Sequence, residues 1–286
     1  MNRKLLKDEK MSNMTTRTIV GFLLGPLVLL CIYFGGWILF GLVTLISIIA
    51  TWEAFMMLKT KSISPNFTLG LWLAILIPLS FINRKIEFSI LFVISLFVIA
   101  LFELFRNKEN PIQNTASTLF FSGYIGIGIG SFLGIRELLQ IQLYDNSFAW
   151  LTIAIIFSLW MCDSFAYFGG KLMGRTKLFP RISPNKTWEG SIWGFIASVL
   201  FMYLFYKFSP MNQLPINYNE VIVIGILIGM FGQIGDLVES MFKRDSGVKD
   251  SSHLIPGHGG FFDRFDSLIF VSPLIFFYLR YIVFPE

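Results

Sequence analysis

The stretch that decides the fold is FAWLTIAIIFSLWMCDSFAYFGG, residues 148–170, in which Asp163 is the only charged side chain. A helix needs about 20 mainly apolar residues to cross a bilayer, and this stretch is long enough. A carboxylate inside such a helix costs several kcal/mol unless it is paired or hydrated, so it usually faces a cavity or a pathway. On a helix, Asp163, Tyr167 and Gly170 share one stripe. The stretch predicts a membrane helix whose carboxylate serves either a functional site or a structural ion pair.

The rest of the chain has the same character. Of its 286 residues, 55% are hydrophobic and only 14% are charged, whereas about 25% are charged in ordinary soluble domains. Apolar segments extend from residue 18 to residue 284, which leaves no stretch for a separate soluble domain. Cys31 and Cys162 each sit in an apolar run, so we interpret both as packing residues. We expect a single all-α integral membrane domain over residues 1–286.

Hydropathy predicts about nine membrane helices. We expect them at residues 18–35, 37–58, 68–83, 88–105, 116–135, 148–170, 190–207, 220–240 and 267–284. The segments within 18–135 form an N-terminal hydrophobic part, and those within 148–284 carry the polar loops.

The basic residues indicate the orientation. With nine spans and an inside N-terminus, 18 of the 23 Lys and Arg residues fall on one side, which is typical of the cytoplasmic side. Both long polar loops, 171–189 and 241–266, fall there too, so we expect them to face the cytoplasm from the inner membrane. Because the basic residues are scattered beside lipid, we expect attraction to anionic lipid headgroups and no binding of nucleic acid.

The loop 171–189 is rich in residues that can hold phosphates. Basic side chains and freely oriented backbone donors both bind phosphate oxygens, although the spacing of a P-loop is absent. Ordinary positive-inside anchoring explains the charge equally well, but it does not explain Glu189 or the turn around Pro184. The candidate nucleotide-binding residues are Lys171, Arg175, Lys177, Ser183, Lys186, Thr187 and Glu189.

The most specific segment is GDLVESMFKRDSGVKDSSHLIPGHGGFFDRFD, residues 235–266. On a helix, Asp236, Glu239, Ser240 and Lys243 fall at i, i+3, i+4 and i+7, so carboxylates and a cation share one face at the end of an apolar span. A second carboxylate pair lies at the mouth of the next span, at Asp263 and Asp266. Together the two mouths can offer oxygen ligands to Mg²⁺ while Lys and Arg hold phosphate oxygens. The alternative is a salt-bridged loop at the membrane interface.

From Ser240 to Asp266 this segment resembles the signature of the phosphatidate cytidylyltransferases. Residues 163–170 and 183–190 are similar to the same family, although Asn185 stands where many members have lysine. The resemblance implies a polytopic, homodimeric enzyme that converts CTP and phosphatidic acid into CDP-diacylglycerol and pyrophosphate. It also implies a requirement for Mg²⁺, leaves a second metal ion open, and makes Asp236 and Asp263 the expected metal ligands.

The expected reaction is attack by the phosphatidate phosphate on the α-phosphorus of CTP. Cationic side chains would bring the two polyanions together, Ser240 would donate a hydrogen bond, and His258 would contact the nucleotide or shape the turn. The candidate catalytic residues are Asp163, Lys186, Ser240, Lys243, Arg244, Lys249, Asp250, His258, Arg264 and Asp266.

Three other functions compete with this interpretation. A CTP-dependent polyprenol kinase would share the nucleotide and the membrane, but its alcohol nucleophile would benefit from a general base. A CDP-alcohol phosphotransferase is disfavoured because that family's spaced aspartates are absent. A transporter or channel would explain the spans and Asp163, but it would not require two large polar loops on one side.

Overall fold

The computed structural model describes residues 21–22, 24–83, 86–138, 147–255 and 259–285. A short helix, Leu24–Phe34, precedes the labelled elements. The longer helices are α2 (Gly36–Leu58), α3 (Phe67–Ile82), α4 (Phe88–Arg106), α5 (Pro111–Glu137), α6 (Ser147–Met173), α7 (Trp188–Phe208), α8 (Tyr218–Leu227), α9 (Gln233–Asp245) and α10 (Phe262–Tyr278). Single turns lie at Lys59–Lys61 (η1), Pro210–Gln213 (η2), Ile228–Gly232 (η3) and Leu279–Val283 (η4).

Seven of the expected spans have a helix long and apolar enough to cross a membrane within the described residues. The two exceptions are Leu24–Phe34 and α3, which are apolar but shorter. Part of the expected span 18–35 lies outside the described residues. The expected count of about nine spans is therefore not confirmed, whereas the predicted helical membrane architecture is.

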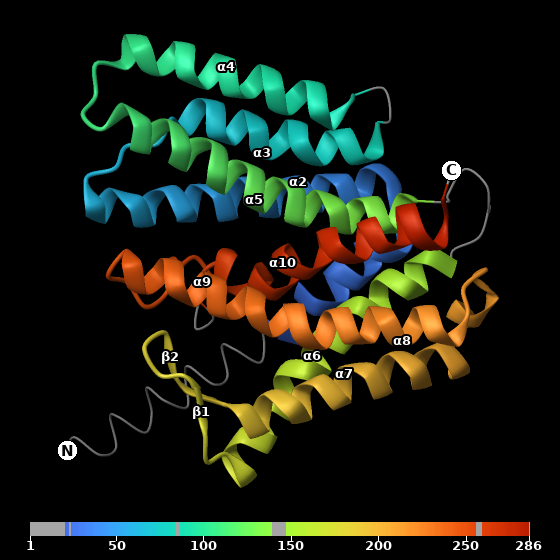
Figure 1. Cartoon of the computed structure of the whole chain (residues 1–286). Helices are drawn as coiled ribbons and strands as arrows, with labels where there is room; N and C mark the ends of the chain where they lie inside the picture. The colour runs from blue at the N-terminus through green and yellow to red at the C-terminus, as the bar shows by residue number, and fades with distance from the viewer. Residues whose placement is uncertain (1–20, 23, 84–85, 139–146, 256–258, 286) are drawn as a thin grey trace.

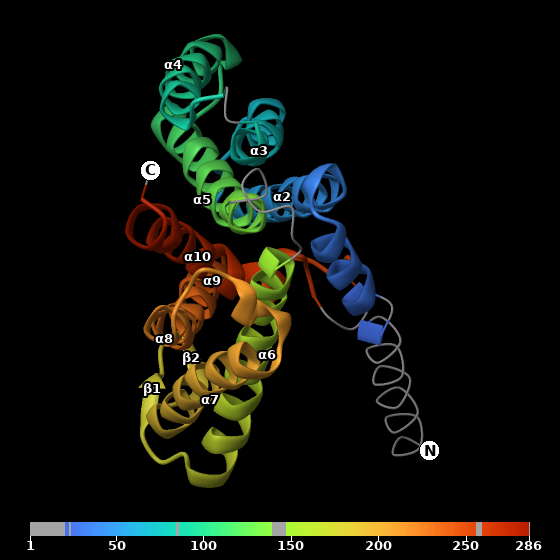
Figure 2. The same ribbon diagram turned by 90° about the vertical axis from the view of Figure 1, so that its right-hand side faces the viewer.

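The helices form two groups with α10 between them. Figure 2 shows α2 to α5 on one side of α10 and α6 to α9 on the other. α10 packs against both α5 and α9, and the closest neighbours within the groups are α3 with α5 and α6 with α7. Buried aliphatic and aromatic side chains from both groups form one continuous core. The N-terminal and C-terminal parts expected from the sequence are thus packed together through α10.

The α6–α7 crossing depends on small residues. A Cβ atom on Gly190 would lie 2.5 Å from the carbonyl oxygen of Ala166, and one on Gly194 would lie 2.7 Å from that of Cys162. Such close backbone approach is the usual role of small residues between membrane helices. It places the start of α7 directly against the half of α6 that carries Asp163.

The polar loop expected at residues 171–189, with a turn around Pro184, contains a short β-hairpin. Within the loop 171–189, β1 (Lys177–Phe179) pairs antiparallel with β2 (Ser183–Thr187). Proline favours an extended conformation in the residue before it, so Pro184 disfavours helix at Ser183. The Trp188 N–H donates to the Thr176 carbonyl at 3.0 Å, which closes the base of the hairpin onto α7.

The helix that carries the second polar segment is longer than expected. α8, η3 and α9 run without a break from Tyr218 to Asp245, whereas the sequence predicted an end at residue 240. η3 is a π-helical turn, which in helices often marks a functional site. Because α9 continues to Asp245, all residues of the predicted polar face, from Asp236 to Lys243, lie on regular α-helix.

Candidate active site

The predicted face of α9 is present in the structure. The Ser240 hydroxyl donates to Asp236 Oδ1 at 3.3 Å, one turn away on the same helix. Lys243 Nζ lies 2.5 Å from Glu239 Oε2, which is fully buried, and 2.7 Å from Asp263 Oδ1 on α10. Lys243 therefore neutralises two buried carboxylates and joins the ends of α9 and α10.

The β1–β2 hairpin brings the first polar loop to the second. Lys186, on β2, places its Nζ 2.6 Å from Asp236 Oδ2 on α9. Arg244 donates to the Ile182 carbonyl at 3.4 Å and to the Val248 carbonyl at 3.3 Å, so it holds the hairpin beside the end of α9. Segments about 50 residues apart in sequence thus contribute opposite charges to one place.

Carboxylates from three helices converge beside this pair. Asp163 on α6 interacts electrostatically with Asp236, Lys186 and Arg264, and Asp266 on α10 interacts with Asp163 and Asp236. Asp163, Arg264 and Asp266 also line a cavity of about 370 Å³, whose other walls are mainly apolar and come from Gly21, the Leu24–Phe34 helix, α2, α6 and the start of α10. Such an arrangement can hold a charged headgroup at the end of an apolar chamber.

The donor chemistry of this cluster fits a hard cation. Carboxylate oxygens are the ligands that Mg²⁺ prefers, and three converging aspartates repel one another unless positive charge lies between them. In the part of the chain that the structure describes, no group of three or more His, Cys, Asp or Glu side chains is already arranged around a metal position. Instead, Asp236 is paired with Lys186, and Asp263 is paired with Lys243.

Several of the predicted nucleotide-binding residues hold the hairpin itself. Both oxygens of Glu189 accept hydrogen bonds from backbone amides, Arg175 N at 3.1 Å and Thr176 N at 3.1 and 3.2 Å. Thr187 Oγ1 accepts from the Gly190 N–H at 3.2 Å, which caps the start of α7. Among the other candidates here, Lys171, Arg175 and Lys177 have exposed side chains, and Ser183 is half-buried.

The remaining predicted residues lie in the connection between α9 and α10. Lys249 and Asp250 are both exposed, and they directly precede Ser251, whose backbone N–H donates to Asp263 Oδ2 at 2.9 Å. His258 lies outside the described residues.

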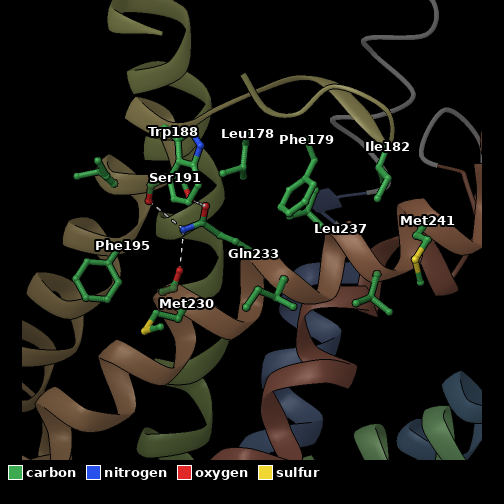
Figure 3. Close-up of a pocket in the computed structure, with 14 residues that line it drawn as sticks. Leu178, Phe179, Ile182, Trp188, Ser191, Phe195, Met230, Gln233, Leu237 and Met241 are labelled. Carbon is green, nitrogen blue, oxygen red and sulfur yellow. Dashed lines mark hydrogen bonds between the residues drawn. The ribbon is translucent and has the colours of Figure 1, made fainter. Parts of the chain in front are cut away.

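A second cavity, of about 620 Å³, lies between the hairpin, α7 and α9 (Figure 3). Its walls are apolar side chains of the hairpin, α7 and α9, such as Phe179, Trp188 and Leu237. Its polar groups are Ser191 and Gln233, which bond to each other at 2.5 Å, while Gln233 Nε2 donates to the Gly229 carbonyl in the π-helical turn at 2.7 Å. Gln233 stands one turn before Asp236, so this groove adjoins the charged cluster.

Sequence reasoning missed Glu53, a fully buried carboxylate on α2. It accepts four hydrogen bonds from the connection between α9 and α10 and from the first turn of α10. The signal that drew attention to Asp163, a charged residue within an apolar run, is also present at Glu53 in the run 37–58.

Comparison with known proteins assigns the chain to a family. The model of the "Cytidylyltransferase family" matches residues 15–282. A protein of Staphylococcus haemolyticus named phosphatidate cytidylyltransferase is 35% identical over 266 residues, which cover 92% of this chain and 97% of the relative. Proteins of the same name from Staphylococcus aureus strain COL and Bacillus subtilis are 40% identical over 195 residues and 44% identical over 156 residues. These alignments cover 67% and 54% of this chain, and 69% and 55% of the relatives. Because the family model matches almost the whole length of this chain, the chain belongs to the cytidylyltransferase family.

Proposed function

We propose that the protein transfers CMP from CTP to phosphatidic acid, giving CDP-diacylglycerol and pyrophosphate in phospholipid biosynthesis. The observation that carries the proposal is the meeting of Lys186 with Asp236 and of Lys243 with Asp263, which joins the two polar loops into one charged site at the end of apolar helices. The names of the related proteins support the same activity.

The chemistry needs charge neutralisation more than a base. The second pKa of a phosphate monoester is about 6, so the phosphatidate phosphate is mostly a dianion at neutral pH and can attack without a strong general base. The barrier is then the approach of two polyanions in line at the α-phosphorus, with pyrophosphate leaving. The cations that we assign to this task are Lys186, Lys243, Arg244, Lys249 and Arg264.

The resident carboxylates would bind the metal that the reaction needs. We propose Asp236 and Asp263 as Mg²⁺ ligands, with Asp163 and Asp266 close by for a second ion. Bound Mg²⁺ would neutralise phosphate oxygens and support departure of pyrophosphate. Lys186 and Lys243 would then move from their carboxylates to the phosphates.

The placement in the membrane is also a proposal. We infer nine spans, with Leu24–Phe34 and α3 completing the seven longer helices. We also infer an inner-membrane location with the charged site facing the cytoplasm, and a homodimer. The one-sided distribution of Lys and Arg supports the orientation, and the family resemblance supports the homodimer.

The decisive experiment follows the label from CTP into lipid. Purified protein in detergent is given phosphatidate, Mg²⁺ and CTP labelled with ³²P at either the α or the γ position. Label that enters lipid from the α position alone would support cytidylyl transfer. Transfer of the γ label to a supplied polyprenol would show a kinase, and no transfer to any lipid acceptor would contradict the proposal.

A further inference from the structure

Glu53 is held by groups that all belong to the far end of the chain. Its Oε1 accepts from the Ser252 hydroxyl at 2.5 Å and from the Phe261 N–H at 3.0 Å. Its Oε2 accepts from the Ser251 hydroxyl at 3.0 Å and from the Phe262 N–H at 2.8 Å. The first amides of a helix have no partner within the helix, and a carboxylate there gains from the helix dipole. Glu53, on α2, therefore caps the start of α10.

The connection between α9 and α10 also holds Asp263. Its Oδ2 accepts from the Ser251 N–H at 2.9 Å and from the Gly260 N–H at 2.8 Å, and the Ser251 hydroxyl lies 2.9 Å from it as well. Ser251 thus stands between the Glu53 and Asp263 carboxylates. Gly260 has no space for a side chain, because a Cβ atom there would lie 2.5 Å from Glu53 Oε2.

The turn after α2, η1, contacts the end of α9. Thr60 Oγ1 donates to the Ser246 carbonyl at 2.8 Å, and Lys61 Nζ lies 2.5 Å from Asp245 Oδ2. One stretch of the N-terminal part, residues 53–61, therefore contacts both the end of α9 and the start of α10. Figure 1 shows the ends of α2 and α9 and the start of α10 on the same side of the molecule.

We infer that Glu53 is a positioning residue for the cytidylyl-transfer site. It fixes the connection between α9 and α10 so that Asp263 and Lys243 keep the geometry that the reaction needs. The inference rests on the proposed function for its effect on turnover. Its structural half, the ordering of this connection, can be tested without any substrate.

Glu53→Gln is the sharpest perturbation because it keeps the size of the side chain. A glutamine has one acceptor oxygen, and its NH₂ group must replace the other carboxylate oxygen. Each carboxylate oxygen faces one backbone N–H, of Phe261 or of Phe262, so either orientation brings two donors together. The start of α10 then loses one of the two backbone hydrogen bonds that Glu53 accepts, while the volume of the side chain in the core stays the same.

Glu103→Gln is the matched control. Glu103 is also a buried carboxylate, and it accepts from Asn114 Nδ2 at 2.8 Å and from Arg106 Nη1 at 2.6 Å. These partners belong to α4 and α5. The control therefore disturbs a buried hydrogen-bonded carboxylate without touching the connection between α9 and α10.

The test combines steady-state kinetics with amide hydrogen exchange on full-length protein in detergent, after size-exclusion chromatography confirms that each variant is folded. Residues that orient metal-binding carboxylates typically cost 10- to 100-fold in activity or metal affinity when replaced. We expect Glu53→Gln to lower kcat by about 10- to 100-fold with KM for phosphatidate within about twofold of wild type. We also expect faster exchange at residues 246–255 and 259–264 without added Mg²⁺. Glu103→Gln should change neither.

Wild-type kcat and unchanged exchange in Glu53→Gln would overturn the inference, and so would an equal loss of kcat in Glu103→Gln. If the wild type itself transferred no CMP, the proposed function would be wrong. The amide hydrogen exchange would then decide alone. Faster exchange confined to residues 246–255 and 259–264 would support the positioning role, and unchanged exchange would overturn it.

Discussion

Replacing Lys243 by methionine would leave two carboxylates without their shared counter-charge. Met keeps most of the apolar stem but removes the ammonium group that lies 2.5 Å from Glu239 Oε2 and 2.7 Å from Asp263 Oδ1. The Lys243, Glu239 and Asp263 side chains are 11%, 0% and 8% exposed, so water cannot replace the lost charge. Removing one partner of a buried ion pair costs about 3–5 kcal/mol, and we expect a loss of that size.

Thermal unfolding in detergent measures this loss. For proteins approaching this size, 1 kcal/mol corresponds to roughly 2–4 °C, so we expect Lys243→Met to lower Tm by about 6–20 °C. Adding Glu239→Gln removes the fully buried charge and should restore part of that loss. The physical reason is that a neutral amide is far less costly to bury than an unpaired carboxylate. The reasoning would be refuted by an unchanged Tm in Lys243→Met. A further fall in Tm on adding Glu239→Gln would also refute the assignment of the Lys243–Glu239 ion pair as a stabilising contact.

The other predictions concern the site and the helix crossing. Lys186→Met should reduce kcat/KM for CTP by about 10- to 100-fold, because a charge-assisted contact to phosphate is worth roughly 1.5–3 kcal/mol; an unaltered value would remove Lys186 from the site. Asp236→Asn should abolish turnover while the protein still inserts and elutes as wild type, and normal turnover would sink its assignment as a metal ligand. Chelation with EDTA should stop the wild-type enzyme and Mg²⁺ should restore it, whereas turnover that persists under chelation would contradict a metal requirement. Gly190→Ala should lower the free energy of unfolding by about 1–3 kcal/mol, since its Cβ would lie 2.5 Å from a backbone oxygen of α6. Gly41→Ala, where nothing lies within 4 Å, is the matched control, and equal melting of the two variants would contradict the packing argument.

The sequence by itself determined the helical membrane architecture and the local arrangement of the second polar segment. Seven spans could be located because the length of an apolar run is a local property that the bilayer thickness makes decisive. The shared face of Asp236, Ser240 and Lys243 followed from helical periodicity, which is also local. The two shorter apolar helices show the limit of this reasoning, because hydropathy alone does not state how long a helix will be.

Only the tertiary structure decided which of these groups meet. The pairing of Lys186 with Asp236 depends on a hairpin that hydropathy does not predict, since its strands are too short and too polar to leave a periodic signal. Glu53 contacts Ser251, Phe261 and Phe262 across about 200 residues of sequence. No periodicity connects positions so far apart, because their distance is set by how the two helix groups pack on α10. That packing brings a carboxylate of the N-terminal part to the start of the helix that carries Asp263.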